Sequence, residues 1–178
     1  MSREPANKWK QDAFAILLMF ISVIIDGFVT SYWGSTLDTS FGLMIPRTLM
    51  LVVIILSFHY KNNFMLISAA VFGFLMDTYY LGFIGVYMAS VLLVAYLATN
   101  LKQAIHPNVL SYTLVSIIAI TMAELVIFGI MKILSITTIS FQVFLVSRLG
   151  ATLLFNGMLM LVFSYFIQQM IIKMMDES

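Results

Sequence analysis

Five ionisable side chains lie within or at the edges of the apolar runs of this chain, and they are its candidates for chemistry: Asp26, Arg47, Asp77, Glu124 and Arg148. Charged groups are costly in lipid. They therefore usually face the interior of a helix bundle, where they mark pairing, partner or transport sites. The helix order derived below places four of them near one side of the membrane, whereas Glu124 falls nearer the middle of its helix.

Two aspartates and two arginines at a similar depth could neutralise each other. Because a guanidinium offers several N–H donors to carboxylates, we expect a network in which Asp26 and Asp77 pair with Arg47 and Arg148. In a second interpretation each group reaches headgroups and water separately. In a third interpretation the charges belong to a transport path.

Glu124 lies too deep in its predicted helix to reach lipid headgroups, so headgroup contact does not explain its presence. Three interpretations stay open: a hydrogen bond between helices made by a protonated Glu124, a contact with a partner protein, and a ligand or proton site. A proton relay needs more than one deep titratable group, and the sequence offers this one only. Farther along the chain, Asn156 aligns with Arg148 and Thr152 at a spacing of four residues.

The composition indicates a protein that is surrounded by lipid. The chain is 62% hydrophobic and 10% charged, against about 45–50% and about 25% in soluble domains. A net charge of +1 gives no basic surface for nucleic acid, and the absence of cysteine excludes disulfides and thiolate metal sites. His59 and His106 are far apart, and no phosphate loop or nucleophile elbow occurs. We therefore expect no metal, no cofactor and no catalysis.

The apolar runs predict an all-α polytopic membrane protein, with one integral membrane domain over residues 1–178 and six transmembrane helices. The predicted helices cover approximately 13–33, 43–60, 64–78, 81–100, 109–133 and 144–171. The run 64–99 would be roughly 54 Å long as one helix, too long for a single crossing of about 30 Å. We expect it to fold back at Asp77–Gly82, with a short first arm that either ends inside the membrane boundary or is re-entrant.

The basic residues predict the orientation. The N-terminal segment MSREPANKWKQD is polar and mostly basic, and the apolar stretch after it continues without a cleavage pattern, which favours an uncleaved first helix. With six crossings, one side carries Arg3, Lys8, Lys10, Lys61, Lys102 and Lys173, and the other carries Lys132, Arg47 and Arg148. This excess predicts that both termini lie in the cytoplasm.

Small residues predict where two helices approach closely. Ala69, Gly73 and Asp77 share a helix face at a spacing of four, and Gly85 and Ala89 do so in the next helix. Such spacing allows membrane helices to pack tightly. We expect a close hairpin of these two helices, with Asp77 and Gly82 near its turn.

The order of these features resembles the MreD family, the membrane subunit of the bacterial rod-shape and cell-elongation complex. The resemblance rests on Pro46, Lys61, the Gly73-x-x-x-Asp77 helix end, Leu81–Gly82 and Tyr96. The part that carries these motifs is about 45–101, and the C-terminal half is similar in hydropathy alone.

The resemblance implies a non-enzymatic scaffold in the bacterial cell membrane, surrounded by membrane lipids. It would bind an MreC-like protein and influence peptidoglycan synthesis by a RodA-type polymerase and its transpeptidase, together with cytoskeletal MreB. The family fold is thought to be similar to the S components of energy-coupling-factor vitamin transporters, so a substrate-binding S component is the alternative. S components often carry small residues on helix 1, whereas here Ala15 is followed four residues later by Met19, which favours the scaffold.

Overall fold

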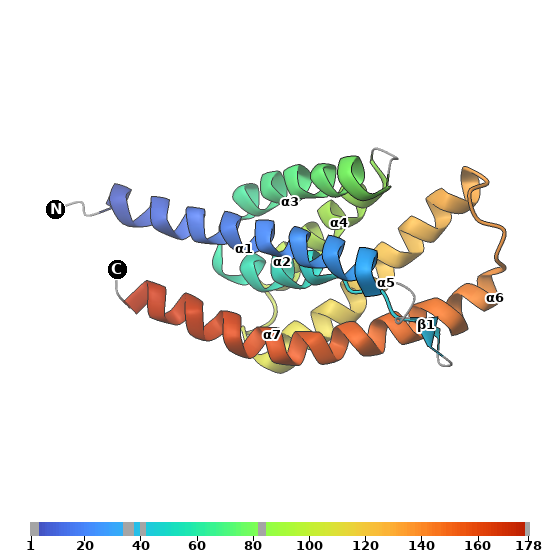
Figure 1. The fold of residues 1–178 in the computed structure, drawn as a ribbon. Helices are drawn as coiled ribbons and strands as arrows, with labels where there is room; N and C mark the ends of the chain where they lie inside the picture. The colour runs from blue at the N-terminus through green and yellow to red at the C-terminus, as the bar shows by residue number, and fades with distance from the viewer. Residues whose placement is uncertain (1–3, 34–37, 40–41, 82–84, 177–178) are drawn as a thin grey trace.

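The structure, a computed structural model, describes residues 4–33, 38–39, 42–81 and 85–176. These residues form a bundle of antiparallel helices, with both termini at the same end (Figure 1). We call this end the terminal end and the opposite one the distal end. The helical segments are α1 (Glu4–Trp33), α2 (Thr48–His59), α3 (Asn62–Met76), η1 (Asp77–Leu81), α4 (Val86–Leu101), α5 (Val109–Ile133), α6 (Phe141–Phe144), η2 (Leu145–Leu149) and α7 (Gly150–Asp176).

Two of these segments are π-helical, and both continue an α-helix. Segment η1 extends α3, and η2 joins α6 to α7 into one long rod. The described helices thus form six rods in an all-α bundle. Helix α5 spans the residues predicted for it. The chain stays helical through Leu81, so the arm that begins at Asn62 is longer than the predicted 64–78.

Length and apolar character mark three described segments as able to cross a membrane by themselves: Trp9–Tyr32, Val109–Ile133 and Phe141–Ile171. Helices α2 and α4 are apolar but shorter. The long helices leave large apolar side chains exposed along their outer faces, among them Leu154, which is 68% exposed. An exposed apolar surface of this extent suits contact with lipid.

Helix α2 is the centre of the bundle. Every residue from Thr48 to Ser57 is buried, as expected for a helix that is apolar on all sides. Helices α1, α3, α4, α5 and α7 all pack against it. The remaining helices therefore form a shell whose inner faces bury α2 and whose outer faces stay apolar.

A two-stranded hairpin closes part of the distal end. Strand β1 (Asp38–Thr39) pairs antiparallel with β2 (Gly42–Leu43). Gly42 has a φ of +121°, and a Cβ there would lie 2.3 Å from the carbonyl oxygen of Ser147 in η2. Only glycine fits both the backbone conformation and this contact. The chain predicted as helical from residue 43 is thus a strand and an extended stretch before α2 begins.

The predicted close approach of α3 and α4 occurs at Gly73. A Cβ on Gly73 would lie 2.7 Å from the Cα of Met88, and Ala69 one turn earlier is fully buried. The other small residues act differently. Gly85 has open space around its Cα and Ala89 is exposed, so neither packs α3 against α4. Gly82 lies outside the described residues.

We expect the substitution Gly73→Ala to lower the free energy of unfolding by roughly 1–3 kcal/mol, because the new methyl group must displace the α4 backbone. Thermal unfolding in detergent micelles measures the change. Gly129→Ala in α5 is the matched control, since a Cβ there meets nothing within 4 Å. Equal melting temperatures for the two variants would contradict the close approach at Gly73.

Candidate functional site: a buried polar cluster at the distal half of the bundle

Glu124 and Arg47 form the deepest ion pair among the described residues. The Nε of Arg47 donates to Oε1 of Glu124 at 2.7 Å, and Nη2 of Arg47 lies 2.5 Å from the same oxygen. Glu124 is fully buried and Arg47 nearly so. The Arg47 guanidinium also lies over the ring of Tyr87, 5.3 Å from its centroid, where the π face favours a cation.

A second arginine approaches the other oxygen of the same carboxylate. Nη2 of Arg148, in η2, lies 3.4 Å from Oε2 of Glu124. The Arg148 side chain keeps 28% of its surface exposed, against 10% for Arg47. Glu124 therefore connects α5 to the start of α2 and to the π-helical segment before α7, with Arg47 as its closer partner.

Asp26 of α1 caps the first turn of α2. Its Oδ1 accepts from the backbone N–H of Thr48 at 2.8 Å and also from the Thr48 hydroxyl, and its Oδ2 accepts from the N–H of Leu49 at 3.0 Å. The residue before α2, Arg47, provides no side-chain cap of its own. A carboxylate at this position satisfies orphan donors and complements the positive end of the helix dipole.

Asp77 does the same for α4. Its Oδ2 accepts from the N–H groups of Gly85 at 2.8 Å and Met88 at 3.0 Å, and its Oδ1 accepts from Tyr87 at 2.8 Å. Gly85, the residue before α4, has φ +106° and lacks a side chain that could cap. Asp77 is fully buried, so these three backbone N–H groups supply the hydrogen bonds that water cannot give to the carboxylate.

The sequence predicted a network in which Asp26 and Asp77 pair with Arg47 and Arg148, and this pairing is wrong: both arginines lie against Glu124, which the prediction had left outside the network. The structure assigns both aspartates to the backbone N–H groups of helix starts and assigns both arginines to Glu124. The physical reason is that a buried helix start leaves several N–H donors unpaired, and each costs free energy in apolar surroundings. The aspartates lie closest to those donors.

Asn156 and Thr152 of α7 hold the segment that leads from β2 into α2. Asn156 accepts from the N–H of Arg47 at 2.8 Å and donates to the carbonyl of Ile45 at 2.7 Å. Thr152 accepts from the N–H of Ile45 and donates to the carbonyl of Leu43. The spacing of four residues that aligns Thr152 and Asn156 with Arg148 indicated in the sequence that they belong to the polar cluster. No such spacing indicated Tyr87 or Thr48.

The chemistry of this polar cluster is that of charge pairing and helix capping. Both oxygens of Glu124 face guanidinium groups, and the aspartate oxygens face backbone donors. Within the described part of the chain, no three His, Cys, Asp or Glu side chains gather as metal ligands would. The cluster connects α1, α2, α5 and α7, while Asp77 connects α3 to α4 beside it.

An all-α bundle with apolar outer faces, whose buried charges are paired across helices, defines a multi-pass membrane protein. The family described as rod shape-determining protein MreD matches residues 11–175 of the chain. The chain belongs to this family, and its place is therefore the bacterial cytoplasmic membrane.

A curated relative supports the assignment. The chain is 32% identical over 111 residues to the rod shape-determining protein MreD of Bacillus subtilis (strain 168). The match covers 62% of this chain and 64% of that relative, so it spans less than two thirds of the relative's length. No solved structure matches the chain. The family and the relative indicate a role in determining rod shape.

Removing Arg47 leaves the buried Glu124 with only the more distant Arg148, and removing Glu124 leaves the buried Arg47 without a carboxylate partner. We expect Arg47→Leu and Glu124→Leu each to lower the free energy of unfolding by roughly 3–5 kcal/mol. The double variant should lose less than the sum of the two, because neither charge of the pair is then left uncompensated. Thermal unfolding in detergent provides all three values.

Lys132→Leu is the control for these variants, since the exposed Lys132 bonds only to the carbonyl of Ile139 in the next loop. Its effect should stay within about 0.5 kcal/mol. Additive losses in the double variant, or an Arg47→Leu loss as small as that of the control, would show that the pair does not hold the helices together.

Asp77→Asn tests the cap on α4. The amide nitrogen cannot accept a hydrogen bond, so at least one backbone N–H becomes unpaired, and we expect a loss of roughly 1–3 kcal/mol. Thr78→Ala is the neighbouring control, because the Thr78 hydroxyl bonds within its own helix. The charge swap of Asp77→Arg with Arg148→Asp should not restore stability. Recovery in that swap would indicate an aspartate–arginine pair after all.

Proposed function

We propose that the protein is a non-enzymatic membrane scaffold of the cell-elongation complex. It binds an MreC-like membrane protein and thereby helps to control peptidoglycan synthesis by a RodA-type polymerase and its transpeptidase, with MreB as the cytoplasmic partner. Residues 1–178 form one membrane domain of six crossings with both termini in the cytoplasm. The position of both termini at one end of the bundle and the excess of basic residues expected there support this orientation.

The observation that carries the proposal is the state of the buried polar groups. In a transporter subunit or a proton path, convergent polar groups have to remain available to a substrate. In this chain the Glu124 carboxylate faces two guanidinium groups, and Asp26 and Asp77 are occupied by backbone donors. Such pairing connects several helices through the interior of the bundle, which suits a platform for other membrane proteins, and it favours the scaffold over the S component of a vitamin transporter.

The test is recovery of the protein with its partners from native membranes, together with its effect on cell shape. We expect affinity-tagged protein to co-purify with an MreC-like protein, and expression of the chain in a rod-shaped bacterium lacking its own MreD to restore rods. Glu124→Leu should reduce both in proportion to the loss of folded protein. Co-purification with transporter ATPases, or without any MreC-like protein, would overturn the proposal.

A further inference from the structure

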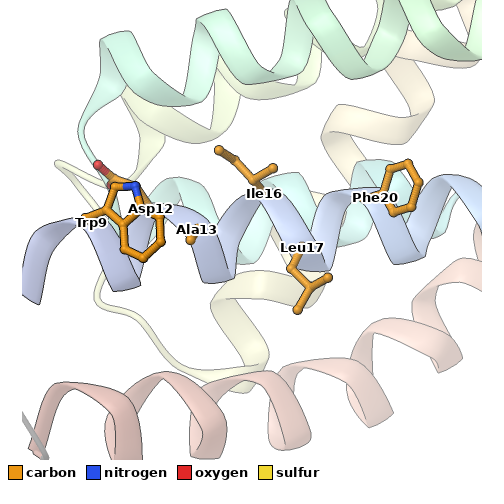
Figure 2. A pocket seen from close by; sticks show the side chains of 6 residues that line it. All are labelled: Trp9, Asp12, Ala13, Ile16, Leu17 and Phe20. Atoms are coloured by element: carbon orange, nitrogen blue, oxygen red, sulfur yellow. The ribbon is translucent and has the colours of Figure 1, made fainter.

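Two adjoining hollows lie on the outer surface of α1. The first is about 480 Å³ and is lined by Trp9, Asp12, Ala13, Ile16, Leu17 and Phe20 (Figure 2). The second is about 320 Å³ and lies between α1 and α3, where Ile16 meets Phe64, Ile67 and Val71. Ile16 lines both hollows, which therefore adjoin at this side chain. We call them together the α1–α3 groove.

The groove exists because α1 packs mainly on α2 and only lightly on α3. Its walls are apolar side chains that nothing in the bundle covers, including Ile67 at 66% exposed and Val71 at 52%. Helices in lipid associate by close packing rather than by the hydrophobic effect. A hollow lined by projecting apolar side chains offers a neighbouring helix such close packing.

The groove carries a carboxylate at its terminal end. Asp12 is half-buried, and both ion pairs of the described residues belong to Glu124 rather than to Asp12. Burial and the nearby Asp12 carboxylate raise the pKa of Tyr60 to about 12, and the Tyr60 hydroxyl donates to the carbonyl of Gln11 at 2.8 Å. Trp9, one turn earlier, is 74% exposed, as interfacial tryptophans are. Asp12 therefore lies at the membrane boundary with its charge uncompensated by the described residues.

We propose that the α1–α3 groove receives the single transmembrane helix of a partner protein, with a Lys or Arg at the cytoplasmic end of that helix paired to Asp12. Membrane helices carry their basic residues at the cytoplasmic boundary, and the orientation proposed above places Asp12 at that level. The charge of Asp12 thus selects both the site and the direction of the incoming helix. The inference rests on the proposed function for the identity of the partner, an MreC-like protein with one membrane helix.

Site-specific photo-cross-linking in native membranes tests the groove. Benzoylphenylalanine is placed at Ile67 and Val71 in the groove, and at Leu114 and Leu154 as controls of similar exposure on α5 and α7. We expect the groove positions to cross-link to residues within the membrane helix of the MreC-like protein at least fivefold more than the controls. Asp12→Lys should lower this yield roughly fivefold, and Asp12→Asn less. Unchanged elution on size exclusion verifies that the Asp12 variants fold.

Reversing the charge of the partner's basic residue should restore the yield with Asp12→Lys. If the MreC-like protein co-purifies but its helix cross-links to Leu114 or Leu154, the groove is overturned while the proposed function holds. Lipid adducts alone at Ile67 and Val71 overturn the groove as well. Cross-linking of the groove to a different single-pass helix with a basic cytoplasmic end supports the groove and contradicts the proposed function.

Discussion

The structure depends on how the buried start of one helix is satisfied. Helix α2 is enclosed on all sides, so the N–H groups of its first turn cannot reach water and need acceptors from elsewhere. Asp26 from α1 and Asn156 from α7 supply them. This requirement fixes where α1 and α7 must lie against α2. The start of α4 imposes the same requirement, and Asp77 meets it.

The charge pairing follows from this arrangement. With the two aspartates engaged by backbone donors, Glu124 is left as the partner of both arginines. The two guanidinium groups balance the carboxylates of Glu124 and the adjacent Asp26 in charge, and the buried Asp77 carboxylate is satisfied by backbone N–H groups at the start of α4. For a member of a family that determines rod shape, an interior connected in this way leaves the outer surface as the place where other proteins are recognised.

Much of the fold is readable from the sequence, because apolar runs of limited length can only cross a bundle and turn back. The run Val109–Ile133 is a helix from end to end, and the close approach at Gly73 follows from its spacing. The pairing of charges was not readable. Hydropathy indicates the depth of a side chain in the membrane but not which side chains of other helices lie beside it. The backbone N–H groups that bind the aspartates cannot be identified from composition. The useful signal was the type of the residue before each helix. Arg47 and Gly85 precede α2 and α4 without a side-chain cap, which indicates that another residue must accept from the first N–H groups.

The contacts of α2 also determine the order in which the bundle can close during synthesis. Thr48 is separated from its partner Asp26 by 22 residues in the sequence, whereas Glu124 and Asn156 follow Arg47 by 77 and 109 residues. At about 5–20 residues per second, the last of these partners emerges roughly 5–20 s after Arg47. Until Glu124 emerges, the first two helices can already be joined through Asp26 while the arginine has no glutamate partner. The nascent chain thus passes through a stage at which the start of its central helix is held by Asp26 without Glu124 or Asn156.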